Sequence, residues 1–198
     1  MLLIPAFEIG LWNAWILMLY VISYNVLPCI LSSRRIIDED IFKKASHPDI
    51  ELTNSQKKLS VIINFIFFIP IIYSIFLPLK LGTVWFYVGL LIYLLGVVIG
   101  TAAAFDFFTT PVDKPVTKGA YRISRNPMYL SMFLIFIGTG IACVSWLFLL
   151  LTMVFLILSH ILVNSEESFC IQKYGSAYKE YMNITKRWIG IPKSGEKR

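Results

Sequence analysis

The chain has 198 residues, of which 57% are apolar and only 15% are formally charged, and its mean hydropathy is +0.71. Soluble domains usually carry roughly a quarter charged residues, so the composition excludes an ordinary soluble fold and indicates helices surrounded by lipid. The net charge of +6 does not indicate a nucleic-acid partner, because the basic residues flank apolar segments, as they do in membrane proteins.

Apolar segments long enough to cross a bilayer recur along the chain. A membrane-spanning helix needs roughly 20 mostly apolar residues, and three segments meet this length directly: 11–31, 59–79 and 84–104. The apolar stretch 128–160 is too long for one crossing and offers turn residues only around 138–145. We therefore predict a tight helical hairpin over 128–163, with its two helices at 128–142 and 145–163.

The five predicted spans make the whole chain, 1–198, a single all-α polytopic membrane domain, with cytosolic elements at 105–127 and 164–190. Basic residues are unevenly divided between the two sides: the 32–58 loop holds six, the 105–127 loop four and the tail after 163 seven, whereas the opposite side holds only Lys80. Positive charge is retained in the cytoplasm. The sequence thus predicts an external N-terminus and a cytosolic C-terminus.

We expect no metal site. The three cysteines are too far apart for a zinc motif or a disulfide framework: Cys29, Cys143 and Cys170. In the polar loop 32–58, which we interpret as a short interfacial helix or a solvated linker, His47 with Asp49 and Glu51 offers too few ligands.

The third span carries Gly96 and Gly100, a pair of small residues one turn apart. Such a pair lets two helices approach closely, and we interpret it as a packing feature. The alternative is that the backbone here approaches a ligand.

A polar, proline-containing loop connects the third and fourth spans. Gly119 is free to adopt a positive φ. Asn126 is at the N-cap position and Pro127 in the first turn of the fourth span, where its missing N–H costs nothing. The N–H groups of Met128 and Tyr129 then point out of a helix end that attracts carboxylates or phosphates. The alternative is an ordinary capped helix entry at the membrane surface.

Two adjacent carboxylates, Glu166 and Glu167, directly follow the last predicted span. They are either solvated or available to a ribose diol or a cationic ligand. Beyond them the tail places three tyrosines on one face of an amphipathic helix, at Tyr174, Tyr178 and Tyr181. This helix is expected to lie on the membrane or to fold over a pocket, with Trp188 as an interfacial anchor.

The tract 116–121 (VTKGAY), followed by 124–129 (SRNPMY), resembles the T-x-G-x-Y … R-[HN]-P-x-Y signature of integral membrane methyltransferases. The paired glutamates followed by Tyr174-Gly175 and Tyr178 are similar to the second signature of that family, EE … YG … Y … Y. The family includes isoprenylcysteine carboxyl methyltransferases and phosphatidylethanolamine-type phospholipid methyltransferases. The resemblance covers roughly residues 84–190, and the compact five-span length is similar to that of prokaryotic members related to the isoprenylcysteine enzymes.

The resemblance implies a cytosol-facing site for S-adenosylmethionine, with S-adenosylhomocysteine as its product. The residues that match the cofactor-binding positions of the family are Lys114, Pro115, Val116, Tyr121, Asn126, Pro127, Met128, Tyr129, Glu166 and Glu167. The first three would line the cofactor and Tyr121 would contact its adenosine part. The tract 126–129 would hold the amino-acid end of the cofactor. One of the two glutamates would bind the ribose hydroxyls or the ammonium group, and the sequence does not distinguish them.

The acceptor implied by the resemblance is lipophilic and enters from the bilayer. The first hypothesis is O-methylation of an isoprenylcysteine-like carboxylate, and the alternative is N-methylation of a phospholipid amine. Two departures bear on this choice: Asn126 replaces the histidine of many members, and the tract 159–164 lacks the arginines of the eukaryotic prenylcysteine enzymes. If the acceptor must lose a proton, the candidate catalytic groups are His160, Glu166 and Glu167. Outside the enzyme class, a small transporter or scaffold subunit is the other hypothesis.

Overall fold

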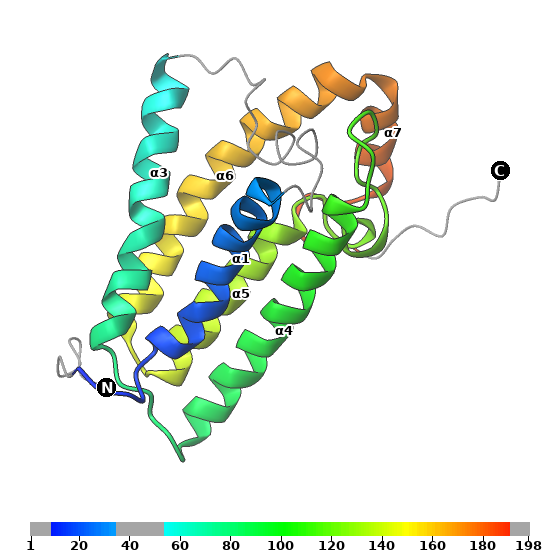
Figure 1. Cartoon of the computed structure of the whole chain (residues 1–198). Coiled ribbons are helices and arrows are strands. Elements are labelled where there is room, and N and C mark those ends of the chain that lie inside the picture. Colours follow the sequence, from blue (N-terminus) through cyan, green and yellow to red (C-terminus); the bar gives the residue numbers. More distant parts are fainter. Residues whose placement is uncertain (1–8, 35–53, 191–198) are drawn as a thin grey trace.

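The computed structural model describes residues 9–34 and 54–190, and every regular element within these ranges is helical. The prediction of an all-α fold is therefore confirmed for the described residues. Six α-helices and two short 3₁₀ helices follow one another (Figure 1): α1 (Trp15–Ser33), α3 (Asn54–Tyr73), η1 (Ser74–Phe76), α4 (Val84–Phe108), η2 (Gly119–Arg122), α5 (Pro127–Ala142), α6 (Trp146–Tyr174) and α7 (Ser176–Ile184). Most of the 32–58 loop, including His47, Asp49 and Glu51, lies outside the described residues.

Five of these helices, α1, α3, α4, α5 and α6, lie alongside one another, and α7 lies across one end of them (Figure 1). Aromatic side chains fill the centre of this bundle. Phe136 of α5 packs against Phe67 of α3 at 5.8 Å and against Phe155 of α6 at 5.7 Å between ring centroids. Because an interior contact between rings buries a large apolar area, these residues hold α3, α5 and α6 together.

α5 and α6 form a helical hairpin whose turn is the segment 143–145. Val144 adopts φ of 54° in this turn, and Ser145 caps α6 by accepting a hydrogen bond from the backbone N–H of Phe148 at 3.2 Å. The turn coincides with the break that Cys143, Val144 and Ser145 introduce into the apolar sequence.

α4 and α5 approach each other closely along a row of glycines. A Cβ at Gly96 would lie 2.9 Å from the backbone nitrogen of Ile135, and one at Gly100 would overlap the hydroxyl of Ser131. Ser131 in turn donates a hydrogen bond to the carbonyl of Gly96 at 2.9 Å. The interpretation of Gly96 and Gly100 as packing residues is therefore confirmed, since a side chain at either position would force the helices apart.

α6 does not end where the apolar sequence ends. We expected the last helix to stop at 163 with the glutamates following it, but α6 continues to Tyr174 and carries both Glu166 and Glu167. The physical reason is that no proline or glycine occurs between 163 and Gly175. Gly175, with φ of 58°, ends the helix. The loss of hydropathy at 164 marks a change of environment and not a change of backbone conformation.

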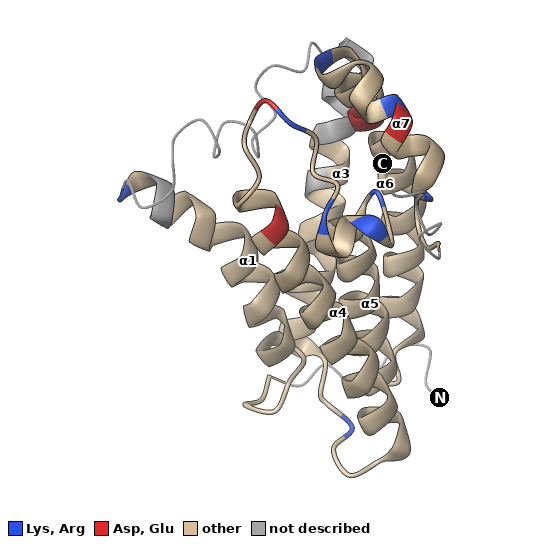
Figure 2. Ribbon diagram, turned by 90° about the vertical axis from the view of Figure 1, so that its right-hand side faces the viewer, with Lys and Arg blue, Asp and Glu red and all other residues tan. Residues whose placement is uncertain are grey.

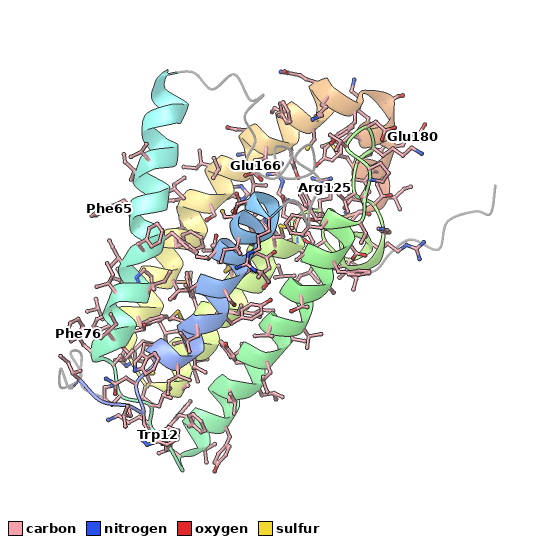
Figure 3. The ribbon with its side chains drawn as sticks, viewed as in Figure 1. Trp12, Phe65, Phe76, Arg125, Glu166 and Glu180 are labelled. Carbon is pink, nitrogen blue, oxygen red and sulfur yellow. The ribbon has the colours of Figure 1, made fainter. Side chains whose placement is uncertain are left out.

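Two helices, α4 and α6, are long and apolar enough to cross a membrane, while the apolar parts of α1 (Trp15–Ile30), of α3 with η1 (Val61–Phe76) and of α5 are shorter. Large apolar side chains cover the outside of the bundle. Phe65 on the outer side of α3 is 72% exposed (Figure 3), and Leu91 of α4 is 71% exposed. An apolar surface of this kind suits a lipid environment.

Charged residues gather at the end of the bundle where α7 lies (Figure 2). The opposite end is formed by the connections 10–14, 77–83 and 143–145, where the backbone N–H of Lys80 donates to the carbonyl of Ala142 at 3.2 Å. The molecule therefore has one polar end and one largely apolar end, and the predicted site residues lie at the polar end.

Candidate functional site

The loop after α4 is fixed to that helix by Asp106, which the sequence analysis did not single out. Its carboxylate accepts a hydrogen bond from the backbone N–H of Ala120 at 2.9 Å. Gly119 has the predicted positive φ, at 54°, and a Cβ there would overlap the Asp106 carboxylate. Asp106 thereby sets the position of η2 and of Tyr121 within it. It is the only acidic residue in the sequence of α4, and this isolation is the signal that could have identified it.

Tyr121 lies in an aromatic cluster covered by α7. The cluster is formed by Ala103, Val116, Tyr121, Tyr178 and Tyr181, and Met128 packs against it. The hydroxyl of Tyr181 donates to the carbonyl of Tyr121 at 2.6 Å. The tyrosine face of the tail is thus folded over the loop between α4 and α5. Three predicted cofactor residues, Val116, Tyr121 and Met128, are brought together here.

Glu166 and Tyr129 form the shortest contact between α5 and α6 at the polar end. The hydroxyl of Tyr129, in the first turn of α5, donates to Oε1 of Glu166 at 2.6 Å. A hydrogen bond from a phenol to a carboxylate is charge-assisted and correspondingly strong. The structure therefore joins two residues that the sequence signatures place 37 positions apart.

Glu167 is held by two arginines and is only 3% exposed. Arg125 donates from Nε to Oε1 at 3.0 Å and from Nη2 to Oε2 at 3.4 Å, and Arg187 donates from Nη2 to Oε2. Asn126 contributes a further donor, with Nδ2 at 3.4 Å from Oε1. A buried carboxylate with this many charge-assisted partners is firmly fixed in place. We call Glu167, Arg125, Arg187 and Asn126 the Glu167 cluster.

The Glu167 cluster also fastens the segment 185–190 to the start of α5. Arg125 donates from Nη1 to the carbonyls of Met182 at 3.1 Å and Thr185 at 3.2 Å. Its backbone N–H donates to the carbonyl of Lys186 at 3.0 Å. Figure 3 shows Arg125 and Glu166 at the same end of the bundle. Arg125 therefore links three segments that are distant in sequence: the loop before α5, the polar part of α6 and the chain after α7.

Asn126 occupies the predicted N-cap of α5 and Pro127 its first turn, but the Asn126 side chain makes no capping hydrogen bond. Its amide instead reaches Glu167 and the carbonyl of Arg187, each at 3.4 Å. The first backbone N–H groups of α5 are thus not capped by that side chain. A helix end in this state favours an anionic group.

Burial raises the pKa of the Tyr121 phenol well above its usual range. Among the neighbouring side chains, Tyr24 of α1 contributes most to this increase, followed by Tyr181 and Glu166. Burial likewise raises the pKa of the Tyr178 and Tyr181 phenols. These tyrosines therefore remain neutral near pH 7, and burial also raises the pKa of the Glu166 carboxyl group, to about 7.

The remaining predicted residues have different surroundings. Lys114 is exposed and Pro115 half-buried on the loop before η2. His160 lies on the face of α6 that carries Glu167, and its ring stacks on Trp188 with centroids 5.9 Å apart and an interplanar angle of 28°. Trp188 also contacts Phe133 of α5 at 5.5 Å. No described hydrogen bond connects His160 to either glutamate.

Arg125 and Arg187 both bind Glu167, and the sequence analysis predicted neither contact. They lie 42 and 20 positions from it, respectively. Arg125 belongs to the recognised tract 124–129, and this membership was an available signal. Arg187 stands beside Trp188 in a tail with several basic residues, and nothing in its local sequence distinguishes it.

The family model described as phospholipid methyltransferase matches residues 77–177, which extend from the end of η1 into α7 and include both glutamates and the start of α5. The comparison with curated proteins gave no significant match. The matched region covers half of the chain and contains Asp106, Tyr121, the Tyr129–Glu166 pair and Glu167. The chain therefore belongs to the phospholipid methyltransferase family, within the integral membrane methyltransferase superfamily that also contains the isoprenylcysteine carboxyl methyltransferases.

Proposed function

We propose that the protein transfers a methyl group from S-adenosylmethionine to a lipid-borne acceptor, at a site formed by the polar ends of α5 and α6. The observation that carries this proposal is the Tyr129–Glu166 hydrogen bond of 2.6 Å beside a helix start that its N-cap side chain leaves uncapped. The family match supports a membrane methyltransferase.

The residues present fit the two charged ends of the cofactor's amino-acid part. The backbone N–H groups of Met128 and Tyr129 suit a carboxylate. Glu166 suits an ammonium group or ribose hydroxyls, and the aromatic cluster around Tyr121 suits an adenine ring. Lys114 and Pro115 remain proposed contacts on the loop before this cluster.

Glu166 is the glutamate that we propose as a cofactor ligand. Glu167 already accepts hydrogen bonds from Arg125, Arg187 and Asn126, so its oxygens are occupied. Glu166 has only the Tyr129 hydroxyl as a described hydrogen-bond partner. We therefore assign Glu167 a positioning role, in which it holds Arg125 and Asn126 at the start of α5.

The cofactor supplies a methyl group on a sulfonium, which an acceptor displaces in line. The protein has to align the acceptor with this methyl group and keep water out. Residues 185–190, fastened by Arg125, and the tyrosines of α7 would cover the site on its polar side. An acceptor that must lose a proton requires a base, for which Glu166 is the nearest candidate and His160 the second.

The acceptor that follows from the sequence is an isoprenylcysteine-like carboxylate. One observation favours the second candidate, a phospholipid amine. Both arginines of the site, Arg125 and Arg187, are paired with Glu167, whereas Glu166 has no cationic side chain as a described partner. Glu166, whose pKa burial raises to about 7, attracts an amine and repels a carboxylate when it is ionised.

We further propose that five spans cross the membrane, from α1, α3 with η1, α4, α5 and the apolar part of α6. The polar end then faces the cytosol, with an external N-terminus. The shorter helices α1 and α5 have apolar exteriors that fit this arrangement. Because they are short, they would span the membrane only with little tilt or where the hydrocarbon layer is thin.

The test is methyl transfer from radiolabelled S-adenosylmethionine to two acceptors presented in the same detergent, N-acetyl-S-farnesylcysteine and a short-chain phosphatidylethanolamine. Alkali releases methanol from a methyl ester but leaves an N-methyl group in place, so the product identifies the acceptor class. We expect transfer to one acceptor, its loss in Glu166→Gln, and its retention in Glu180→Gln, which changes an exposed carboxylate of α7. Transport or scaffold function predicts no transfer to either acceptor.

A further inference from the structure

Two polar side-chain atoms are buried without a hydrogen-bond partner among the described residues, the hydroxyls of Tyr24 and Ser159. Folded proteins pair nearly all such groups, because an unpaired buried hydroxyl retains its desolvation cost. Both residues belong to apolar helices, α1 and α6, where lipid offers no substitute for water. An unpaired hydroxyl in such a position is accounted for if a ligand supplies the missing partner.

The Tyr24 hydroxyl lies beside the proposed site. Among the side chains that raise the pKa of the Tyr121 phenol, Tyr24 has the largest effect, ahead of Tyr181 and Glu166. It follows Tyr20 by one helical turn toward the polar end, and the two rings lie 5.9 Å apart. Tyr20 has partners, because its hydroxyl bonds to the carbonyl of Val97 at 3.2 Å and lies 3.1 Å from Oγ1 of Thr101.

A lipid would reach the Tyr24 hydroxyl from the side of the bundle on which α1 lies. The helix lies outside the region 77–177 that matches the family, so its contribution cannot be read from the family signatures. Its outer face carries exposed apolar side chains, with Leu19 50%, Ile22 43% and Val26 46% exposed. A lipid in contact with this face has its polar head at the same end of the bundle as Tyr24.

The geometry points to Tyr24 as a specificity-determining residue whose hydroxyl donates a hydrogen bond to an oxyanion of the acceptor lipid, a phosphate or a carboxylate. This inference rests on the proposed function. Glu166 offers an oxyanion no positive charge, and Arg125 and Arg187 are both paired with Glu167. A phenol is neutral near pH 7 and carries one donor, so Tyr24 can hold the oxyanion without a counter-charge.

The test compares Tyr24→Phe with Tyr20→Phe, a matched control on the same helix whose hydroxyl is already paired. Affinity for short-chain phosphatidylethanolamine and for N-acetyl-S-farnesylcysteine is measured by thermal-shift titration, and affinity for S-adenosylmethionine by calorimetry. We expect Tyr24→Phe to weaken binding of one lipid about tenfold, the loss typical of a hydrogen bond to a charged group, with cofactor affinity unchanged. The ligand-free melting temperature should stay equal or rise, since the substitution removes an unpaired polar atom. Tyr20→Phe should lower that temperature and leave lipid affinity unchanged.

The lipid whose binding is weakened shows whether the oxyanion is a phosphate or a carboxylate. Unchanged binding of both lipids by Tyr24→Phe overturns the inference, as does a wild-type protein that binds neither lipid. A lower ligand-free melting temperature in Tyr24→Phe with unchanged lipid affinity means that the hydroxyl is structural, and this too overturns it. If the wild type binds a lipid through Tyr24 but binds no S-adenosylmethionine, the lipid contact stands and the proposed function fails.

Discussion

The adjacent residues Glu166 and Glu167 have different surroundings although one peptide bond separates them. Successive residues of a helix point about 100° apart, so Glu166 faces Tyr129 of α5 while Glu167 faces the arginines. One carboxylate is left with a neutral partner and the other is neutralised by two cations. The same dipeptide thus provides one carboxyl group that we propose as a cofactor ligand and one that is held in place by arginines.

Replacing Glu167 is expected to destabilise the protein much more than replacing Glu166. Glu167→Gln leaves Arg125 and Arg187 without their counter-charge in a mostly buried position, which costs about 3 kcal/mol. Glu166→Gln keeps an oxygen for the Tyr129 hydroxyl and should change stability little. Thermal unfolding of the two variants in one detergent makes the comparison. Equal melting temperatures would contradict the structural role of Glu167.

Gly119→Ala is expected to be more damaging than Gly175→Ala. Both glycines have positive φ, 54° and 58°, and an alanine is strained at either position. Only at Gly119 would the new Cβ also overlap a carboxylate, that of Asp106, whereas nothing lies within 4 Å at Gly175. Chemical denaturation of each variant measures the difference. Similar losses at both positions would show that Asp106 does not fix the loop.

Single residues of the site could be predicted from the sequence only in part. The tract 124–129 and the glutamate pair indicated Asn126, Tyr129, Glu166 and Glu167 because the residue types and their order resemble a known signature. Their pairing could not be predicted, because it depends on how α5 and α6 rotate against each other. The partners of Glu167 come from segments 42 and 20 positions away, and sequence spacing carries no information on such contacts.

At the scale of elements, α4 and α5 form the closest helix pair in the described bundle, and Gly89 marks the closest approach of their backbones. A Cβ at Gly89 would overlap the backbone nitrogen of Ala142 and lie 2.5 Å from the carbonyl of Gly138. Backbone atoms cannot move aside as a flexible side chain can. The hairpin α5–α6 is therefore positioned against α4 by contact between backbones.

Gly89→Ala is expected to lower the free energy of unfolding by about 1–3 kcal/mol, the loss typical of overpacking, and to lower the melting temperature accordingly. The control is Val98→Ala on the same helix, where the side chain is 65% exposed and its loss should matter little. A thermal scan of both variants in detergent suffices. If Gly89→Ala unfolds at the wild-type temperature, the close packing of α4 on α5 is incorrect.

Helix positions were more predictable than helix ends. The apolar segments coincide with the apolar parts of α1, α3, α4, α5 and α6, because hydropathy and turn residues are local properties. The end of α6 was wrong, since hydropathy falls at 164 while the backbone stays helical to Tyr174. α3 likewise begins at Asn54 and not at 59. In both cases polar residues extend a helix beyond its apolar part.

For the whole molecule, the separation of charge between its two ends predicts its orientation in the membrane. Lys114 lies on the loop at the polar end and Lys80 on the connection at the opposite end. In a variant without the three native cysteines, Lys114→Cys should react with an impermeant maleimide only from the cytosolic side, and Lys80→Cys only from the outside. Labelling of both positions from the same side would contradict the proposed topology.

The proposed function depends on Glu166 of α6, which lies beside the start of α5, binding S-adenosylmethionine and its product. Calorimetric titration of S-adenosylhomocysteine into the purified protein in native-like lipid tests this claim most directly. We predict measurable binding by the wild type and by Glu180→Gln, and affinity weakened about tenfold in Glu166→Gln, since a charged hydrogen-bond partner is lost. Binding that is absent from the wild type, or that is equally strong in Glu166→Gln, would contradict the account.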